Sequence, residues 1–180
     1  MKNQRVYKMV TCAIFAAIMC VLGPMSIPIG PVPVSFTNLV IYLAAILLGA
    51  KLSTVSYLVY MLLGIVGLPV FSGFQGGVGK LAGPTGGYLV AFIIMAFISG
   101  LVFEKSKGNV VISGIGMIVA TAVAYLFGTV WFVIEMKCEF MYALSVCVFP
   151  FVVFDLIKIV IALVLGKAVK FALNKAGLAS

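Results

Sequence analysis

The sequence predicts an all-α membrane protein with six transmembrane helices. Of its 180 residues, 64% are apolar and only 9% are charged, whereas soluble domains average about 45–50% apolar and about 25% charged residues. The apolar residues also form long runs that are broken by glycine, proline or a few charges. A helix needs about 20 such residues to cross the bilayer core. No ten-residue alternating pattern typical of a β-barrel is present.

Six runs have a suitable length, and we expect the whole chain, residues 1–180, to form one membrane domain. The predicted spans lie near residues 7–23, 34–50, 52–70, 84–103, 110–134 and 149–167. Only Lys51 separates the second span from the third, which favours a tight hairpin with Lys51 at the turn. The first span resembles a signal peptide in length, but no small-x-small cleavage site follows it, so we expect a retained helix.

Basic residues predict the orientation of the spans. Nine of the 12 fall on the side that holds both termini, and only Lys80 and Lys137 fall on the other side. Because cytoplasmic loops are enriched in lysine and arginine, both termini are expected to be cytoplasmic. The formal charge of +8 is then explained by topology and by contact with membrane lipid, and no nucleic acid partner is needed. Glu104, Glu135 and Glu139 are expected to be solvated charges.

Asp155 and Lys158 are the charged residues expected inside a span. They lie three residues apart within 149–167, so they share one face of the helix. A bare carboxylate among the apolar residues of a transmembrane helix costs roughly 2.5–3.5 kcal/mol. Charges inside a membrane are therefore functional candidates by default. A buried ion pair that only neutralises itself is the alternative. We interpret the pair as part of a ligand site.

The segment 67–88 is rich in glycine, with eight glycines and two prolines in 22 residues. Glycine lets backbone approach a ligand closely, and the helix expected to begin near Pro84 offers free N–H groups to an anion. A flexible outer loop is the alternative, but the segment contains several aromatic and aliphatic side chains, so we interpret it as a ligand cover. Its candidate binding residues are Gln75, Lys80, Thr85, Gly86, Gly87 and Tyr88.

Small residues form one face of the first span. Ala13, Ala16, Ala17 and Cys20 follow helical spacing, and Ala13 and Ala17 make an AxxxA step. Such faces let helices approach closely in lipid. The spacing alone does not distinguish packing within this chain from contact with a partner.

The sequence contains few of the residues and motifs that metal sites and enzymes need. There is no histidine, the four cysteines form no CxxC pair, and no ATP-binding or hydrolase motif is present. We therefore expect no metal, no cofactor and no enzyme activity. Cys138 and Cys147 lie in one outer region and are able to pair, although two unpaired thiols are the favoured interpretation.

Several segments resemble the BioY family, the biotin-binding S components of energy-coupling factor (ECF) vitamin transporters. The resemblance is carried by GLPVFSGFQGGVGKLAGPTGGYL from residue 67, PVPVSFTNL from residue 31 and DLIK at 155–158, and it covers nearly the whole chain. Thr37 departs from the pattern, since many members have glutamine there, and Asn38 stands beside it.

The resemblance implies an ECF S-component-like bundle in a bacterial cell membrane, with a vitamin site near the outer face. It also implies partners, namely a transmembrane coupling subunit and two cytoplasmic ABC-type ATPases. In the family the coupling subunit meets an alanine-rich face of the first helix. Ala13 and Ala17 match that face, which favours a partner contact there.

Biotin suits the candidate residues chemically. The N–H groups of its ureido ring need an acceptor such as Asp155, and its carbonyl needs a donor such as Lys158. Its carboxylate would then point toward Lys80 or the N–H groups near residues 84–87. The alternative gives Lys158 to the carboxylate. At the level of function, an S component for another vitamin and a solitary carrier that does not use ATP remain alternatives to biotin uptake.

Overall fold

The structure is a computed structural model, and it describes residues 2–29 and 32–176. Helices dominate this part of the chain. In chain order the elements are α1 (Lys2–Leu22), β1 (Ser26–Ile29), β2 (Val32–Ser35), α2 (Thr37–Ile65), α3 (Val78–Ala82), α4 (Gly86–Lys105), α5 (Val110–Met136), α6 (Phe140–Cys147) and α7 (Phe149–Lys175). Five of the described helices, α1, α2, α4, α5 and α7, are long and apolar enough to cross a membrane.

The long helix α2 consists of two segments that meet at Gly49. Gly49 has φ +78°, a left-handed conformation that side chains disfavour, and a Cβ at this position would lie 1.9 Å from the Glu104 carboxylate. That carboxylate is not simply solvated as expected, because its Oε1 accepts a hydrogen bond of 3.0 Å from the Ala50 N–H. The break therefore lies two residues before Lys51, which the sequence had suggested as the turn.

The two segments of α2 run in opposite directions. In the first segment, Asn38 contacts Asp155 and Ile46 lies against Gly166. Residue numbers thus increase in the same direction along both helices, so this segment is parallel to α7. In the second segment, Ser56 contacts Cys12 and Tyr60 lies against Gly23, so that segment is parallel to α1.

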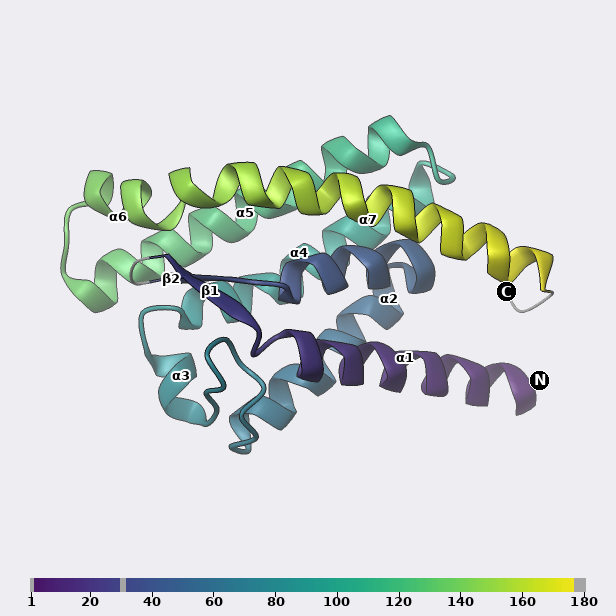
Figure 1. Ribbon diagram of the computed structural model, residues 1–180, viewed down its shortest axis with the longest axis horizontal. Helices are drawn as coiled ribbons and strands as arrows, with labels where there is room; N and C mark the ends of the chain where they lie inside the picture. The colour runs from purple at the N-terminus through teal and green to yellow at the C-terminus, as the bar shows by residue number, and fades with distance from the viewer. Residues whose placement is uncertain (1, 30–31, 177–180) are drawn as a thin grey trace.

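The chain therefore makes six passes. The predicted six-helix membrane fold is confirmed, and Figure 1 shows α2 folding back on itself in the middle of the bundle.

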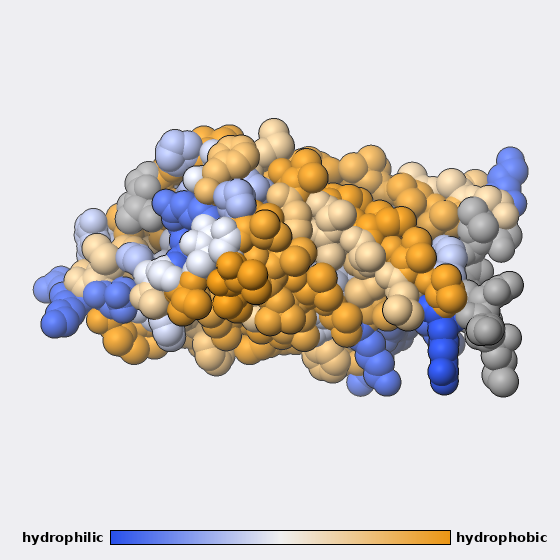
Figure 2. Space-filling view, turned by 90° about the horizontal axis from the view of Figure 1, so that it is seen from below, coloured by the Kyte–Doolittle hydropathy of each residue, from blue (hydrophilic) through white to orange (hydrophobic). Residues whose placement is uncertain are grey.

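The two ends of the bundle differ in what they carry. Both termini lie at one end, together with the Gly49 turn and the α4–α5 connection, while the strands, α3 and α6 lie at the other (Figure 1). Between the ends, Figure 2 shows a broad apolar surface, with hydrophilic residues gathered towards the ends. The predicted separation of basic residues into two groups thus matches the two ends of the molecule.

A short β-hairpin precedes α2, although the sequence had suggested only helices. Its two strands are antiparallel, and Pro28 is paired with Pro33. Proline is tolerated here because each strand has one free edge. Val32 and Val34 point inward and are buried, while Ile27 on the other strand is half exposed. Val34, which the sequence placed at the start of the second span, belongs to this hairpin.

The glycine-rich segment between α2 and α4 is ordered by an aromatic anchor. Phe71 is fully buried, and its ring packs edge-on against Tyr60 at 5.7 Å. Its backbone pairs with that of Gln75, and the Tyr60 hydroxyl donates to the Val70 carbonyl. The segment is therefore packed onto the bundle and does not behave as a plain linker.

Candidate functional site

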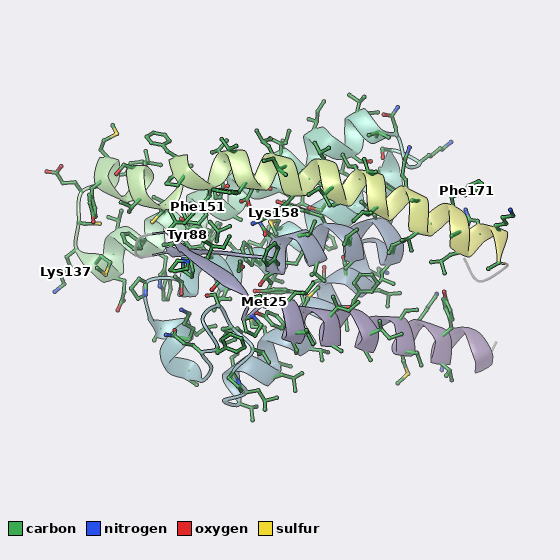
Figure 3. The ribbon with its side chains drawn as sticks, viewed as in Figure 1. Met25, Tyr88, Lys137, Phe151, Lys158 and Phe171 are labelled. Carbon is green, nitrogen blue, oxygen red and sulfur yellow. The ribbon has the colours of Figure 1, made fainter. Side chains whose placement is uncertain are left out.

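A small, partly open cavity of about 60 Å³ lies near the end that carries the β-hairpin. Its walls come from the hairpin, α2, α4, α5, α6 and α7, with Ser72 and Thr85 contributed by the glycine-rich segment. Most of the lining is apolar or aromatic, and it includes Phe92, Met95 and Phe151. Figure 3 shows Tyr88, Phe151 and Lys158 on this side of the molecule, while Phe171 lies at the opposite end. Small-molecule sites have this character, with apolar walls and a few convergent polar groups.

The polar groups of this cavity form one connected network around Asp155. Its Oδ1 accepts hydrogen bonds from Lys158 Nζ at 3.0 Å and from Asn38 Nδ2 at 2.6 Å, and its Oδ2 accepts from the Tyr125 hydroxyl at 2.6 Å. Lys158 also donates to Asn38 Oδ1 at 3.0 Å and to the Ser35 carbonyl at 2.8 Å. The structure thus brings Asp155 and Lys158 together as the sequence predicted.

The charged pair is buried, which makes its partners necessary. Asp155 and Lys158 are 5% and 7% exposed. Burying a charge is costly unless it is paired and hydrogen-bonded, and here Lys158 uses all three of its N–H groups. The sequence spacing indicated the pair, but it did not indicate that Asn38 holds both members.

The network leaves two positions open. A carboxylate has about four acceptor sites, and three hydrogen bonds are made to Asp155, of which Oδ2 accepts one. The Asn38 amide nitrogen uses one of its two hydrogens for Asp155. Among the residues that the structure describes, one acceptor site on Asp155 and one donor on Asn38 therefore remain available, and both residues line the cavity.

Other predicted site residues fall in a second, more open cleft. Gln75, Lys80 and Thr85 line this cleft of about 500 Å³, together with Pro84 and three glycines. Thr85 lines both cavities, so the two are neighbours. Lys80 is half-buried, and desolvation lowers the pKa of its ammonium group.

Gly86 and Gly87 lie at the start of α4 but contribute through packing. A Cβ on Gly86 would lie 1.6 Å from the Leu81 carbonyl oxygen, and one on Gly87 would lie 2.2 Å from the Trp131 side chain. The Gly86 N–H already donates to the Gly83 carbonyl. Neither glycine lines the two cavities. Tyr88 lines the first cavity, and its hydroxyl group is hydrogen-bonded to that of Thr129.

The small-residue face of α1 is divided by the packing. Ala16 is buried at 3% exposure, whereas Ala13 and Ala17 are exposed. The described part of the bundle thus leaves the two alanines of the AxxxA step exposed.

The four cysteines are free thiols, in agreement with the favoured interpretation. Cys147 is buried in the wall of the first cavity, and Cys138 packs against the same cluster of side chains.

Sequence reasoning missed Asn38, Tyr125 and the β-hairpin as parts of the site. A weak signal was present for two of them, because Asn38 and Tyr125 each place a hydrogen-bonding group within an apolar run. Tertiary structure decides which of these groups face one another. Thr37, which departs from the family pattern, is buried in the cavity wall and accepts a hydrogen bond from Ser35.

Fold and site together define a class of protein. This is a multi-pass α-helical membrane protein with an apolar cavity, lined by a few convergent polar groups, near one end of its bundle. The chain belongs to the BioY family, whose sequence model matches residues 1–175. The resemblance seen in the sequence is thereby confirmed.

Related proteins match the chain over most of its length. A biotin transporter BioY2 from Lactococcus lactis subsp. cremoris (strain MG1363) is 35% identical over 174 residues, which cover 97% of this chain and 96% of the relative. A biotin transporter BioY from Thermotoga maritima is 39% identical over 168 residues, with 91% and 95% covered. A crystal structure at 2.1 Å of the S-component for biotin from an ECF-type ABC transporter superposes with a TM-score of 0.88 at 29% identity, with 94% of each chain covered.

Proposed function

We propose that this protein is the membrane subunit that binds biotin for uptake by an ECF-type transporter. The observation that carries the proposal is the buried Asn38–Asp155–Lys158 network on the wall of an apolar cavity, in a chain of the BioY family. Its role is binding and transport, and it is not an enzyme. Biotin is its substrate and no cofactor is implied.

The ureido ring of biotin fits the positions that the network leaves open. An N–H of the ring would donate to Asp155 Oδ2, beside the Tyr125 hydroxyl. The ring carbonyl would accept from the second amide hydrogen of Asn38, or from Lys158 if Lys158 gives up one of its present acceptors. Hydrogen bonds with a charged partner in a dry cavity are among the strong ones. The thioether ring and the aliphatic chain would lie against Phe92, Met95 and Phe151.

The carboxylate of biotin would then point past Thr85 toward the second cleft. Lys80 is the basic residue that lines this cleft. A bound carboxylate would form an ion pair with its ammonium group, which is partly desolvated. Asp155 and Lys158 share one helix turn, whereas the two ends of biotin are far apart. This favours the ureido ring for that pair and Lys80 for the carboxylate.

For the assembly, we propose that Ala13 and Ala17 contact a transmembrane coupling subunit that works with two cytoplasmic ABC-type ATPases. The support is their exposure on α1, because small exposed residues allow a second helix to approach closely in lipid. We further propose that the protein lies in the bacterial cell membrane with both termini cytoplasmic, since the basic residues concentrate at that end.

The first experiment identifies the ligand. Native mass spectrometry of the protein purified in detergent, after exposure to an equimolar mixture of biotin, thiamin and riboflavin, should detect biotin alone. Retention of a different vitamin would overturn the substrate assignment while leaving the class of transporter intact. Uptake that persists in cells without any coupling subunit or ATPase would instead support a solitary carrier.

Orientation is tested separately by single-cysteine labelling in a variant that lacks the four native cysteines. A membrane-impermeant reagent should label positions 75 and 137 in intact cells and should not label position 105. Labelling of position 105 from outside would reject the proposed topology.

A further inference from the structure

A third cavity, which is a polar cleft, lies at the opposite end of the bundle from the biotin cavity. It encloses about 590 Å³ between the Gly49 turn of α2, the α4–α5 connection and the C-terminal part of α7. In Figure 1 this part of α7 runs past the turn of α2, close to both termini. Its size falls within the range of small-molecule sites, about 300–1,000 Å³. The biotin proposal makes no use of it.

Three lysines converge on this cleft. Lys167 and Lys170 come from one face of α7, where they are followed at helical spacing by Asn174, and Lys107 comes from the α4–α5 connection. Within residues 5–29 and 32–176, the structure gives none of these three ammonium groups a carboxylate partner at ion-pair distance. Topology alone explains why lysines collect at this end. It does not explain why these three line one cavity.

The acidic residue in the lining of the cleft neutralises the lysines only in part. Glu104 lines the cleft, but one of its oxygens holds the Ala50 N–H in the turn of α2. Three lysines against one glutamate leave a formal excess of two positive charges in the lining. The cleft is therefore suited to an anion that carries one or two negative charges.

Aromatic side chains add an apolar component to the same cleft. The Lys170 ammonium lies 4.7 Å from the centre of the Phe103 ring, and Phe171 is 72% exposed beside it. Toward the N-terminal end of α7, Val160 and Val164 are exposed on the same helical face as Lys167 and Phe171. A ligand that met all these groups would need an anionic head and an apolar tail.

We propose that this cleft binds the headgroup of an anionic phospholipid, with the phosphate between Lys107, Lys167 and Lys170 and the acyl chains along α7. Basic cavities between helices on the cytoplasmic side of membrane proteins recognise such headgroups. A free phosphate would use the same lysines, but it would gain nothing from Phe171 or from the apolar surface of α7. The lipid would thus tie the C-terminal part of α7 to the turn of α2.

The test compares two double variants that remove equal charge at the same end of the protein. Lys167→Gln/Lys170→Gln changes the cleft, whereas Lys51→Gln/Lys105→Gln changes two lysines that do not line it. Native mass spectrometry would titrate phosphatidylglycerol, phosphatidylcholine and inorganic phosphate onto each purified protein. Biotin affinity, measured on the same samples, checks that each variant is folded, because the cleft begins roughly 14 Å along α7 from Lys158.

The unchanged protein should prefer phosphatidylglycerol to phosphatidylcholine, and the cleft variant should bind phosphatidylglycerol roughly tenfold more weakly or worse. The control variant should stay within about threefold of the unchanged protein. Equal losses in both variants, or no preference for phosphatidylglycerol in the unchanged protein, would overturn the proposal. Displacement of phosphatidylglycerol by millimolar phosphate would assign the cleft to a free anion. If the double variant does not fold, Lys167→Gln and Lys170→Gln are tested singly, each with a loss of about threefold or more expected.

Discussion

The first and last helices, α1 and α7, share many features but differ in the residues that they place on their exposed and buried faces. Both are long and apolar, and both expose many large hydrophobic side chains. On its buried face α7 carries Asp155 and Lys158 into the cavity, whereas α1 contributes no residue to that cavity. The exposed face of α1 instead contains Ala13 and Ala17. Binding and coupling are thus expected to depend on different helices, and substitutions should separate the two.

The largest effect is expected on α1. Ala17→Trp or Ala13→Trp should abolish biotin uptake and leave biotin affinity within about threefold of the unchanged protein, because bulk on this face blocks the approach of a partner helix. Uptake of labelled biotin by cells and calorimetry on purified protein measure the two effects. Ala122→Trp, at an exposed alanine of α5, is the matched control and should retain uptake. Loss of binding together with uptake would mean that the α1 face serves internal packing.

The reverse pattern is expected on α7. Asp155→Asn leaves Lys158 buried without its charged partner, and Lys158→Met strands Asp155 in the same way. Losing one member of such a pair typically costs about 2–5 kcal/mol, so biotin affinity should fall roughly 30-fold or more in each variant.

The double variant Asp155→Asn/Lys158→Met should cost less than the sum of the two single changes, because no stranded charge remains. Calorimetry on detergent-solubilised protein measures all three variants, and Lys167→Met on the same helix is the control. Affinity within about threefold of the parent in both single variants would show that the pair is structural.

A smaller effect is expected for the neutral member of the network. Asn38→Leu removes one hydrogen bond from Asp155 and one from Lys158 while keeping the ion pair, so affinity should fall roughly tenfold. Tyr125→Phe removes only the bond to Asp155 Oδ2 and should cost less. If calorimetry ranks Tyr125→Phe as the more damaging change, the proposed role of Asn38 is wrong.

The smallest effect is expected at Lys80, which lies outside the helix pair under comparison. An ion pair near the surface is worth up to about 1 kcal/mol, so Lys80→Gln should weaken biotin binding by about fivefold or less. The same substitution should leave the affinity for biotinamide, which lacks the negative charge, unchanged. Lys137→Gln, which changes another lysine at the same end of the bundle, should affect neither ligand. Equal losses for biotin and biotinamide would place the carboxylate elsewhere.

Hydropathy and spacing were sufficient to predict the six passes and the Asp155–Lys158 pair. Lipid demands long apolar runs, so the runs mark the helices, and two charges within one run share a face by helical geometry. The same apolar character makes the other residues of the cavity wall difficult to predict. In α4 and α5 nearly every residue is apolar, so periodicity does not reveal which side faces the cavity, and Tyr125 could not be assigned to it.

The β-hairpin could not be predicted for a different reason, and neither could the fact that different residues of the glycine-rich segment line different cavities. Residues 26–35 alternate apolar residues with proline and serine over a length that is too short to separate a strand pair from the start of a span. The separation of Lys80 from Asp155 depends on how Phe71 anchors the intervening segment onto Tyr60. That contact is tertiary, and no local pattern encodes it.

The turn at Gly49 has a consequence for the order in which the chain is built. The Ala50 N–H at this turn receives its acceptor from Glu104, which lies 54 residues farther along the chain. During synthesis the second and third passes emerge before Glu104 exists, and an unpaired N–H is costly in hydrocarbon. We therefore expect this turn to stay in contact with water at the membrane surface until α4 has been made. The second and third passes would enter the membrane as an incomplete pair, and the arrival of α4 would close it.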